Sequence, residues 1–218
     1  MNQIFANFSV PLATVVFTSV AILHLIKKNH LAVWWYVVQS SAVVILLLSS
    51  AVKAPSFLAF IAIIATIGVK IIIAPYFFFE LIKKHQLKFS VTTYLNMPLT
   101  LFVIAVLGAI TRTDFFWPLG QLAGSNTNAC FIAFSAIAIS LFLIVNRKGA
   151  LSQMLGVLSL ENSIVTFALF AGLEQSPALQ LGITFDILLW VTISAVFISM
   201  LYKHFGTLNV TTLQKLHD

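Results

Sequence analysis

Residues 56–82 have the sequence SFLAFIAIIATIGVKIIIAPYFFFELI, in which Lys70 and Glu80 are the charged side chains. An α-helix rises about 1.5 Å per residue, so about 20 apolar residues cross the roughly 30 Å hydrocarbon core of a bilayer. Backbone amides in that core must pair within the protein, and the apolar run is continuous rather than alternating, which excludes a barrel strand. This segment therefore predicts a transmembrane helix.

Runs of the same kind recur along the whole chain. They lie at residues 8–26, 31–52, 56–82, 94–111, 128–146, 149–173 and 178–202. Of the 218 residues, 60% are hydrophobic and 8% are charged, whereas about 25% of the residues of a soluble domain are charged. Because so few charges cannot solvate a globule, the sequence predicts an all-α, polytopic transmembrane helix bundle of about seven spans.

The basic residues lie mainly on one side of the predicted bundle. Nine follow odd-numbered spans, namely Lys27, Lys28, Lys83, Lys84, Lys88, Arg147, Lys148, Lys203 and Lys215. Only Lys53 and Arg112 follow even-numbered spans. Basic loops stay in the cytoplasm, so we expect a multi-pass protein of the inner (cytoplasmic) membrane, with its N-terminus outside and its C-terminus inside. Short clusters between spans also make nucleic-acid binding unexpected, despite a net charge of +6.

The two halves of the chain share features at a constant offset. Lys27-Lys28-Asn29 precedes the second span as Asn146-Arg147-Lys148 precedes the sixth, 119–120 positions later. The ends of the third and seventh spans, at 79–84 and 199–204, are also 120 positions apart. We therefore expect a parallel repeat of two three-helix units, at residues 1–90 and 128–218, joined by a connector helix and loop at 91–127.

Three charged residues lie deep inside the predicted spans: Lys70, Glu161 and Asp186, whereas Glu80 falls in the last turn of its span. Such a charge costs about 2.5–3.5 kcal/mol on insertion scales. Glu161 and Asp186 fall at similar depths, roughly 18 Å from the inner face, so we expect them to share one polar site. Burial and a neighbouring like charge both disfavour ionisation, so the pair could exchange protons near neutral pH. Alternatively, they are neutral acids that only hold helices together through hydrogen bonds to Asn162, Ser159, Ser163 or Thr184.

Lys70 has two interpretations. Its stem could snorkel toward the inner interface, or its ammonium could face the protein interior as a protonatable or charge-pairing group. Pro75 frees a backbone carbonyl about one turn earlier, and that local break favours the second interpretation.

Four polar residues form a second tier of candidates for a proton path: Asn162, Thr184, Gln39 and His24. Gln39 is also typical of helix–helix packing, and His24 is expected at the membrane interface. We expect no metal site, since Cys130 is the single cysteine, and nothing forms a phosphate loop, a catalytic triad or a ligand cluster.

Several short stretches of the sequence resemble those of a known family. The matching stretches are Asn146-Arg147-Lys148, Gln153-Met154-Leu155-Gly156-Val157, Leu160-Glu161-Asn162-Ser163, Thr184 with Asp186, Gly206-Thr207-Leu208-Asn209-Val210, and Lys70 followed five residues later by Pro75. The C-terminal unit is similar to the small K-type membrane subunit of respiratory complex I. The chain as a whole resembles the hydrogenase-4 component E family, a relative with additional N-terminal helices.

The resemblance implies a membrane subunit of a redox-driven ion-translocating complex, non-catalytic and without a cofactor of its own. Its implied partners are the antiporter-like and proximal membrane subunits of such an assembly. Glu161 and Asp186 would be proton-path residues, with Lys70 as a further candidate. Both acids are displaced by about one helical turn from the K-type glutamates. The resemblance therefore supports the equivalence of the helices more strongly than the equivalence of the acidic sites. The alternatives are a non-conducting structural linker in such a complex and a stand-alone secondary transporter.

Overall fold

The computed structural model describes residues 2–53, 55–87, 93–173, 176–206 and 208, and over these residues the chain is helical with no strand. In chain order the elements are α1 (Asn2–Leu25), α2 (Asn29–Lys53), α3 (Phe57–Thr66), η1 (Ile67–Ile73), α4 (Ala74–Lys84), α5 (Met97–Ile110), η2 (Asp114–Phe116), α6 (Trp117–Leu122), η3 (Gly124–Asn126), α7 (Thr127–Asn146), α8 (Ala150–Phe170) and α9 (Pro177–Phe205).

Six helices are long and apolar enough to cross a membrane: α1, α2, the continuous α3–η1–α4, α7, α8 and α9. The segment expected to be the fourth span is different. There α5 has only 14 residues, about 21 Å of helix, and a 54° bend separates it from the following helical segment, Asp114–Gln121. Among the described residues the predicted all-helical class is confirmed, and of the roughly seven predicted spans six are present as membrane-length helices, or seven if the bent α5 segment is one span.

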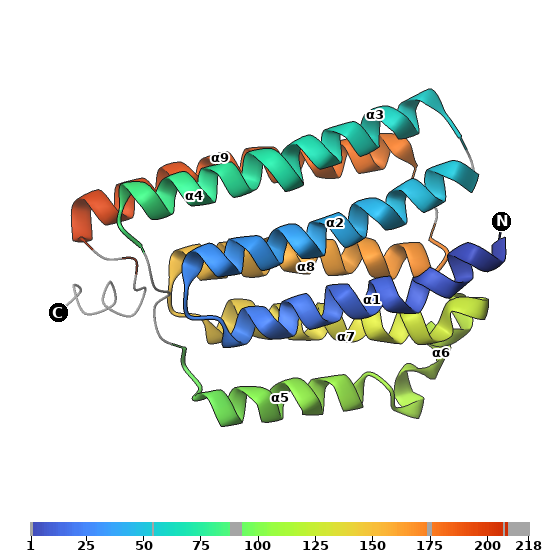
Figure 1. Ribbon diagram of the computed structural model, residues 1–218. Helices are drawn as coiled ribbons and strands as arrows, with labels where there is room; N and C mark the ends of the chain where they lie inside the picture. Colours follow the sequence, from blue (N-terminus) through green and yellow to red (C-terminus); the bar gives the residue numbers. More distant parts are fainter. Residues whose placement is uncertain (1, 54, 88–92, 174–175, 207, 209–218) are drawn as a thin grey trace.

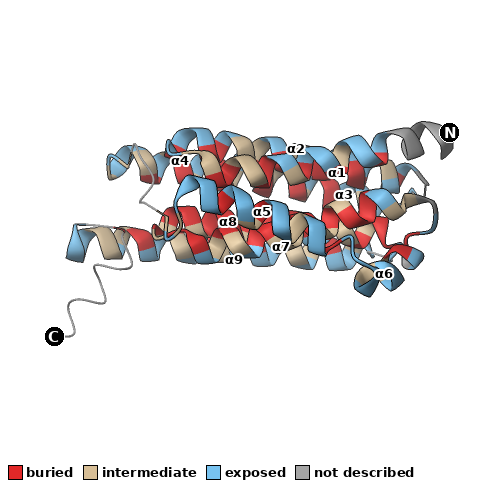
Figure 2. Ribbon diagram, turned by 90° about the horizontal axis from the view of Figure 1, so that it is seen from below, coloured by how far each residue is buried: buried red, intermediate tan, exposed pale blue. Residues whose placement is uncertain are grey.

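The long helices are arranged in pairs, and each pair joins the two halves of the chain (Figure 1). Helix α1 packs on α7, α2 packs on α8, and the α3–η1–α4 helix packs on α9. Helix α5 lies outside these pairs, on the flank formed by α7 and α1. Buried residues follow the inner faces of the helices, while the outer faces are exposed (Figure 2) and carry large apolar side chains such as Phe57 and Phe102. An apolar exterior suits helices that face lipid.

The basic residues gather at one end of the bundle, where α1, α4, α7 and α9 end and α2 and α8 begin (Figure 1). Lys88 and Lys215 of the predicted set lie outside the described residues, as do Thr207, Asn209 and Val210 of the family-like tail. Arg147 differs from its exposed neighbours because it is buried and donates to the carbonyls of Leu23 and Ile26 at the end of α1. Burial lowers its pKa to about 10, so the guanidinium remains charged at pH 7 and stabilises the negative end of α1.

Helices α7 and α8 approach each other closely at Gly156. A Cβ at this position would lie 2.9 Å from Ile144 Cγ1 and 3.3 Å from the Ile144 backbone nitrogen. The backbone cannot move without separating the helices, so a small residue is required here. Gly108 on α5 has no atom within 4 Å of an added Cβ, and it provides a matched control.

We predict that Gly156→Val destabilises the protein by about 1–3 kcal/mol, the usual cost of overpacking. Gly108→Val introduces the same side chain into a membrane helix and should cost much less. The measurement is the unfolding free energy of each purified variant, from SDS titration in detergent. Equal losses for the two variants would contradict the close approach of α7 and α8.

Candidate functional site

Lys70 lies at the centre of the third long helix, in a segment with altered backbone geometry. It is the fourth of the seven residues of η1, a π-helical segment in which the Ala74 amide donates to the Val69 carbonyl. Pro75 has no amide hydrogen, so the Ile71 carbonyl loses its α-helical donor and the hydrogen-bond pattern must change nearby. The local break expected from Pro75 is therefore present, and it surrounds Lys70.

The ammonium of Lys70 forms an ion pair with Glu161 on α8. Nζ donates to Glu161 Oε2 at 2.5 Å and to Asn162 Oδ1 at 2.9 Å. The Lys70 side chain is 0% exposed and that of Glu161 is 20% exposed. Glu161 is the twelfth of the 21 residues of α8, so both charges lie near the middle of their helices. Lys70 thus points inward instead of snorkelling to an interface, and this is the one salt bridge found in the described part of the chain.

A polar network extends from the ion pair into α2. Asn162 Nδ2 donates to Ser40 Oγ at 2.9 Å, and Gln39 Nε2 donates to the Ser159 carbonyl at 3.2 Å. Ser40, Gln39, Asn162 and Ser159 are all buried. Helix α8 is therefore joined by polar contacts around Lys70 to two helices of the first half of the chain, α2 and the α3–η1–α4 helix.

Three acceptor atoms in this region are buried without a hydrogen-bond partner among the described residues: Glu161 Oε1, Gln39 Oε1 and Ser159 Oγ. Buried polar atoms are normally paired with protein or water. Of the three groups, only the Glu161 carboxylate can take up a proton, whereas the Gln39 amide oxygen and the Ser159 hydroxyl can accept hydrogen bonds from water.

One helical turn before Lys70, Thr66 connects α3 to α9. Thr66 Oγ1 and Thr184 Oγ1 are 3.2 Å apart, and Gln180 Nε2 donates to Thr66 Oγ1 at 3.4 Å. Thr184 was a predicted candidate, whereas Gln180 was missed. The signal was present, because Gln180 lies four residues before Thr184 and so on the same face of a helix.

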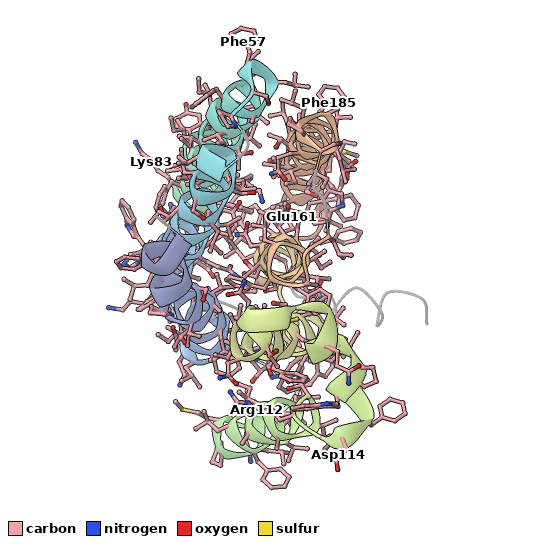
Figure 3. The ribbon with its side chains drawn as sticks, turned by 90° about the vertical axis from the view of Figure 1, so that its right-hand side faces the viewer. Phe57, Lys83, Arg112, Asp114, Glu161 and Phe185 are labelled. Carbon is pink, nitrogen blue, oxygen red and sulfur yellow. The ribbon has the colours of Figure 1, made fainter. Side chains whose placement is uncertain are left out.

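The expectation that Glu161 and Asp186 share one site is wrong for this chain. Asp186 is exposed on α9 and has no hydrogen bond or ion pair within the described structure. Thr184 and Ile187 form the buried face of α9, and Asp186, two residues from Thr184, lies about 200° around the helix. Figure 3 shows Glu161 in the interior of the bundle and Phe185, the neighbour of Asp186, on its outside. Similar depth did not bring the two carboxylates together.

His24 is separate from this network. Its side chain is buried between α1 and α7, with Nε2 3.0 Å from the Ile139 carbonyl and its ring stacked on Phe142 at 4.9 Å. His24 lies in the last turn of α1, and its side chain is buried within the bundle rather than exposed. Its contacts are those of a residue that joins two helices.

Comparisons with known proteins find one short similarity. The chain is 32% identical over 95 residues to the uncharacterized protein Rv0085 of Mycobacterium tuberculosis. The aligned segment covers 44% of this chain and 43% of that protein, less than half of either. No protein-family model matches the chain, and no solved structure matches it.

The ion pair predicts a large energetic coupling between its two members. Removing one partner of a buried pair leaves an uncompensated charge and typically costs about 3–5 kcal/mol. We expect Lys70→Met and Glu161→Met each to destabilise strongly, and the double variant to lose less than the sum of the two by about 1–3 kcal/mol. The measurement is a double-mutant cycle: the unfolding free energies of the wild type, the two single variants and the double variant, each from SDS titration.

A parallel cycle with Thr66→Val and Thr184→Val is the control. That pair joins the same region through a neutral hydrogen bond, so its coupling should be smaller. Additive effects of the Lys70 and Glu161 substitutions would show that the two side chains do not interact.

Proposed function

We propose that this chain is a membrane subunit of a hydrogenase-4-like or complex-I-like complex, which couples a redox reaction to ion translocation, and that Lys70 and Glu161 lie on its proton path. The observation that carries the proposal is the buried ion pair at the centre of two long apolar helices. Ionisable residues within membrane helices are costly and mark ion or proton pathways. The resemblance to the hydrogenase-4 component E family, which includes Lys70, Pro75 and Glu161, supports the choice of complex.

The ion pair can respond to proton delivery as a switch. In a low-dielectric interior the attraction between Lys70 and Glu161 is strong only while both are charged. A proton that reaches Glu161 removes its charge and leaves the ammonium held by Asn162 alone. Lys70 is then biased to release a proton or to move away, and the π-helical η1 is a segment that can adjust. In this proposal Asn162, Gln39 and Thr184 are polar neighbours of the path.

The exposed position of Asp186 supports the presence of partner subunits. It is exposed on α9 among apolar exposed neighbours, including Phe185, Leu189 and Ile193. A carboxylate facing hydrocarbon costs about 2.5–3.5 kcal/mol, and contact with another membrane subunit would remove that cost. We therefore propose that Asp186 continues the path across a contact with an antiporter-like or proximal subunit of the complex.

The proposal includes an inner-membrane location, an outside N-terminus and a parallel repeat of two three-helix units. The gathering of basic residues at one end of the bundle supports the orientation. Two observations support the repeat: helices of one half pair with helices of the other, and the hydrogen bonds Gln39–Ser159 and Ser40–Asn162 join residues 120 and 122 positions apart.

For the transport role we predict that Glu161→Gln preserves assembly but lowers proton translocation severalfold. A glutamine amide oxygen can still accept from Lys70, yet it cannot take up a proton. Asp186→Asn should lower translocation as well. Proton uptake is measured in inverted membrane vesicles and divided by the amount of assembled complex.

Asp114→Asn is the matched control, since it removes an exposed carboxylate from η2, which Figure 3 shows far from Glu161, and it should leave uptake unchanged. Normal uptake per complex in both path variants would refute the proton-path role. A reduced yield of complex with unchanged uptake per complex would instead favour the structural linker. Purification of the chain without other membrane subunits would favour a stand-alone transporter.

The orientation predicts different labelling of two introduced cysteines. In a Cys130→Ala background, Thr113→Cys should react with a membrane-impermeant maleimide on intact cells, because it is exposed at the end proposed to face outside. Lys28→Cys, exposed at the basic end, should react only after permeabilisation. The reverse pattern would show that the bundle is inserted the other way round.

A further inference from the structure

A cavity of about 650 Å³ lies between α4 and α9, at the end of the bundle where the basic residues gather. This volume lies within the usual range for small-molecule sites, about 300–1,000 Å³. The cavity does not include Lys70 or Glu161, and its role is independent of the proposed proton path.

The walls of the cavity change from apolar to charged along the two helices. The apolar part is lined by Phe77, Leu81, Ala195 and Val196. Lys84 and Lys203 line the other part, seven residues after Phe77 and eight after Ala195, which is about 10–12 Å along a helix. The cavity is therefore amphipathic, with its charged part at the basic end.

The charge of this site comes mainly from the two lysines. Lys84 and Lys203 are exposed, and neither side chain pairs with a group in the described structure. His85 also lines the cavity, with Nε2 3.4 Å from Ser199 Oγ. Burial, and then the charge of Lys84, lower the pKa of His85, so it is neutral at pH 7. With Glu80 as the acidic lining residue, the site has two positive charges and one negative charge.

We propose that this cavity binds an anionic membrane phospholipid, with its phosphate between Lys84 and Lys203 and an acyl chain against Phe77 and Ala195. Basic pockets between membrane helices on the cytoplasmic side recognise anionic head groups. The His85–Ser199 pair lies beside the charged part and offers polar contacts to the head group. A zwitterionic lipid carries its own cation and gains less from two unpaired lysines.

Native mass spectrometry of the full chain tests this site, with phosphatidylglycerol and phosphatidylcholine added in equal amounts. We expect the wild-type protein to retain phosphatidylglycerol preferentially. The double variant Lys84→Gln/Lys203→Gln should bind it about 25-fold more weakly, since each lysine near an anionic head group contributes about fivefold. Thr192→Phe places a ring in the cavity without changing charge, and should reduce the retention of both lipids.

Lys27→Gln/Lys28→Gln is the matched control, because it removes two exposed charges at the same end without touching the cavity. It should change phosphatidylglycerol binding by no more than about twofold, as expected for a general surface effect. Equal retention of the two lipids by the wild-type protein, or equal losses in the two double variants, would overturn the proposal.

Discussion

A lysine at the centre of a membrane helix has to find its counter-charge within the protein, because hydrocarbon offers neither water nor ions. Lys70 meets this requirement through Glu161 and Asn162, adjacent residues of α8 that lie about 100° apart and reach the same ammonium. The pair determines which face of the third long helix turns toward α8. It also explains why the proline-induced break at η1 lies inside the bundle, where the neighbouring polar groups are.

The rest of the bundle is held mainly by close packing. In lipid, apolar helices gain little from the hydrophobic effect, so small residues and interhelical hydrogen bonds decide how they associate. Gly156 permits the close approach of α7 to α8, Asn162 reaches Ser40 on α2, and Thr66 reaches Thr184 on α9. These contacts join the first half of the chain to the second. The ion pair therefore lies within a packed framework, and we expect removal of either charge to lower the stability of the bundle.

The two membrane carboxylates have different environments and so different proposed roles. Glu161 is one-fifth exposed and faces a lysine, whereas Asp186 is exposed on an apolar helix face without a partner in the described structure. In the proposed complex, Glu161 acts within this subunit and Asp186 acts at its border with another. The amphipathic cavity between α4 and α9 is a third environment, at the end of the bundle where lipid head groups would lie. The two proposals thus assign to one chain an interior, a subunit contact and a lipid contact, each with its own charged residues.

Length and hydropathy determined the helical class and the approximate spans, because every helix that crosses a bilayer needs about 20 mainly apolar residues. The sequence also identified Lys70 and Glu161 as exceptional, since charges stand out in apolar runs, and Pro75 indicated the altered backbone near Lys70. The partner of Glu161 was decided only by the tertiary structure: depth along a helix follows from residue number, but the direction of a side chain depends on helix rotation and on which helices are neighbours. The burial of Arg147 and His24 and the shortness of α5 depended on packing in the same way. Local sequence determines which segments become helices, and contacts between distant segments decide which charges meet.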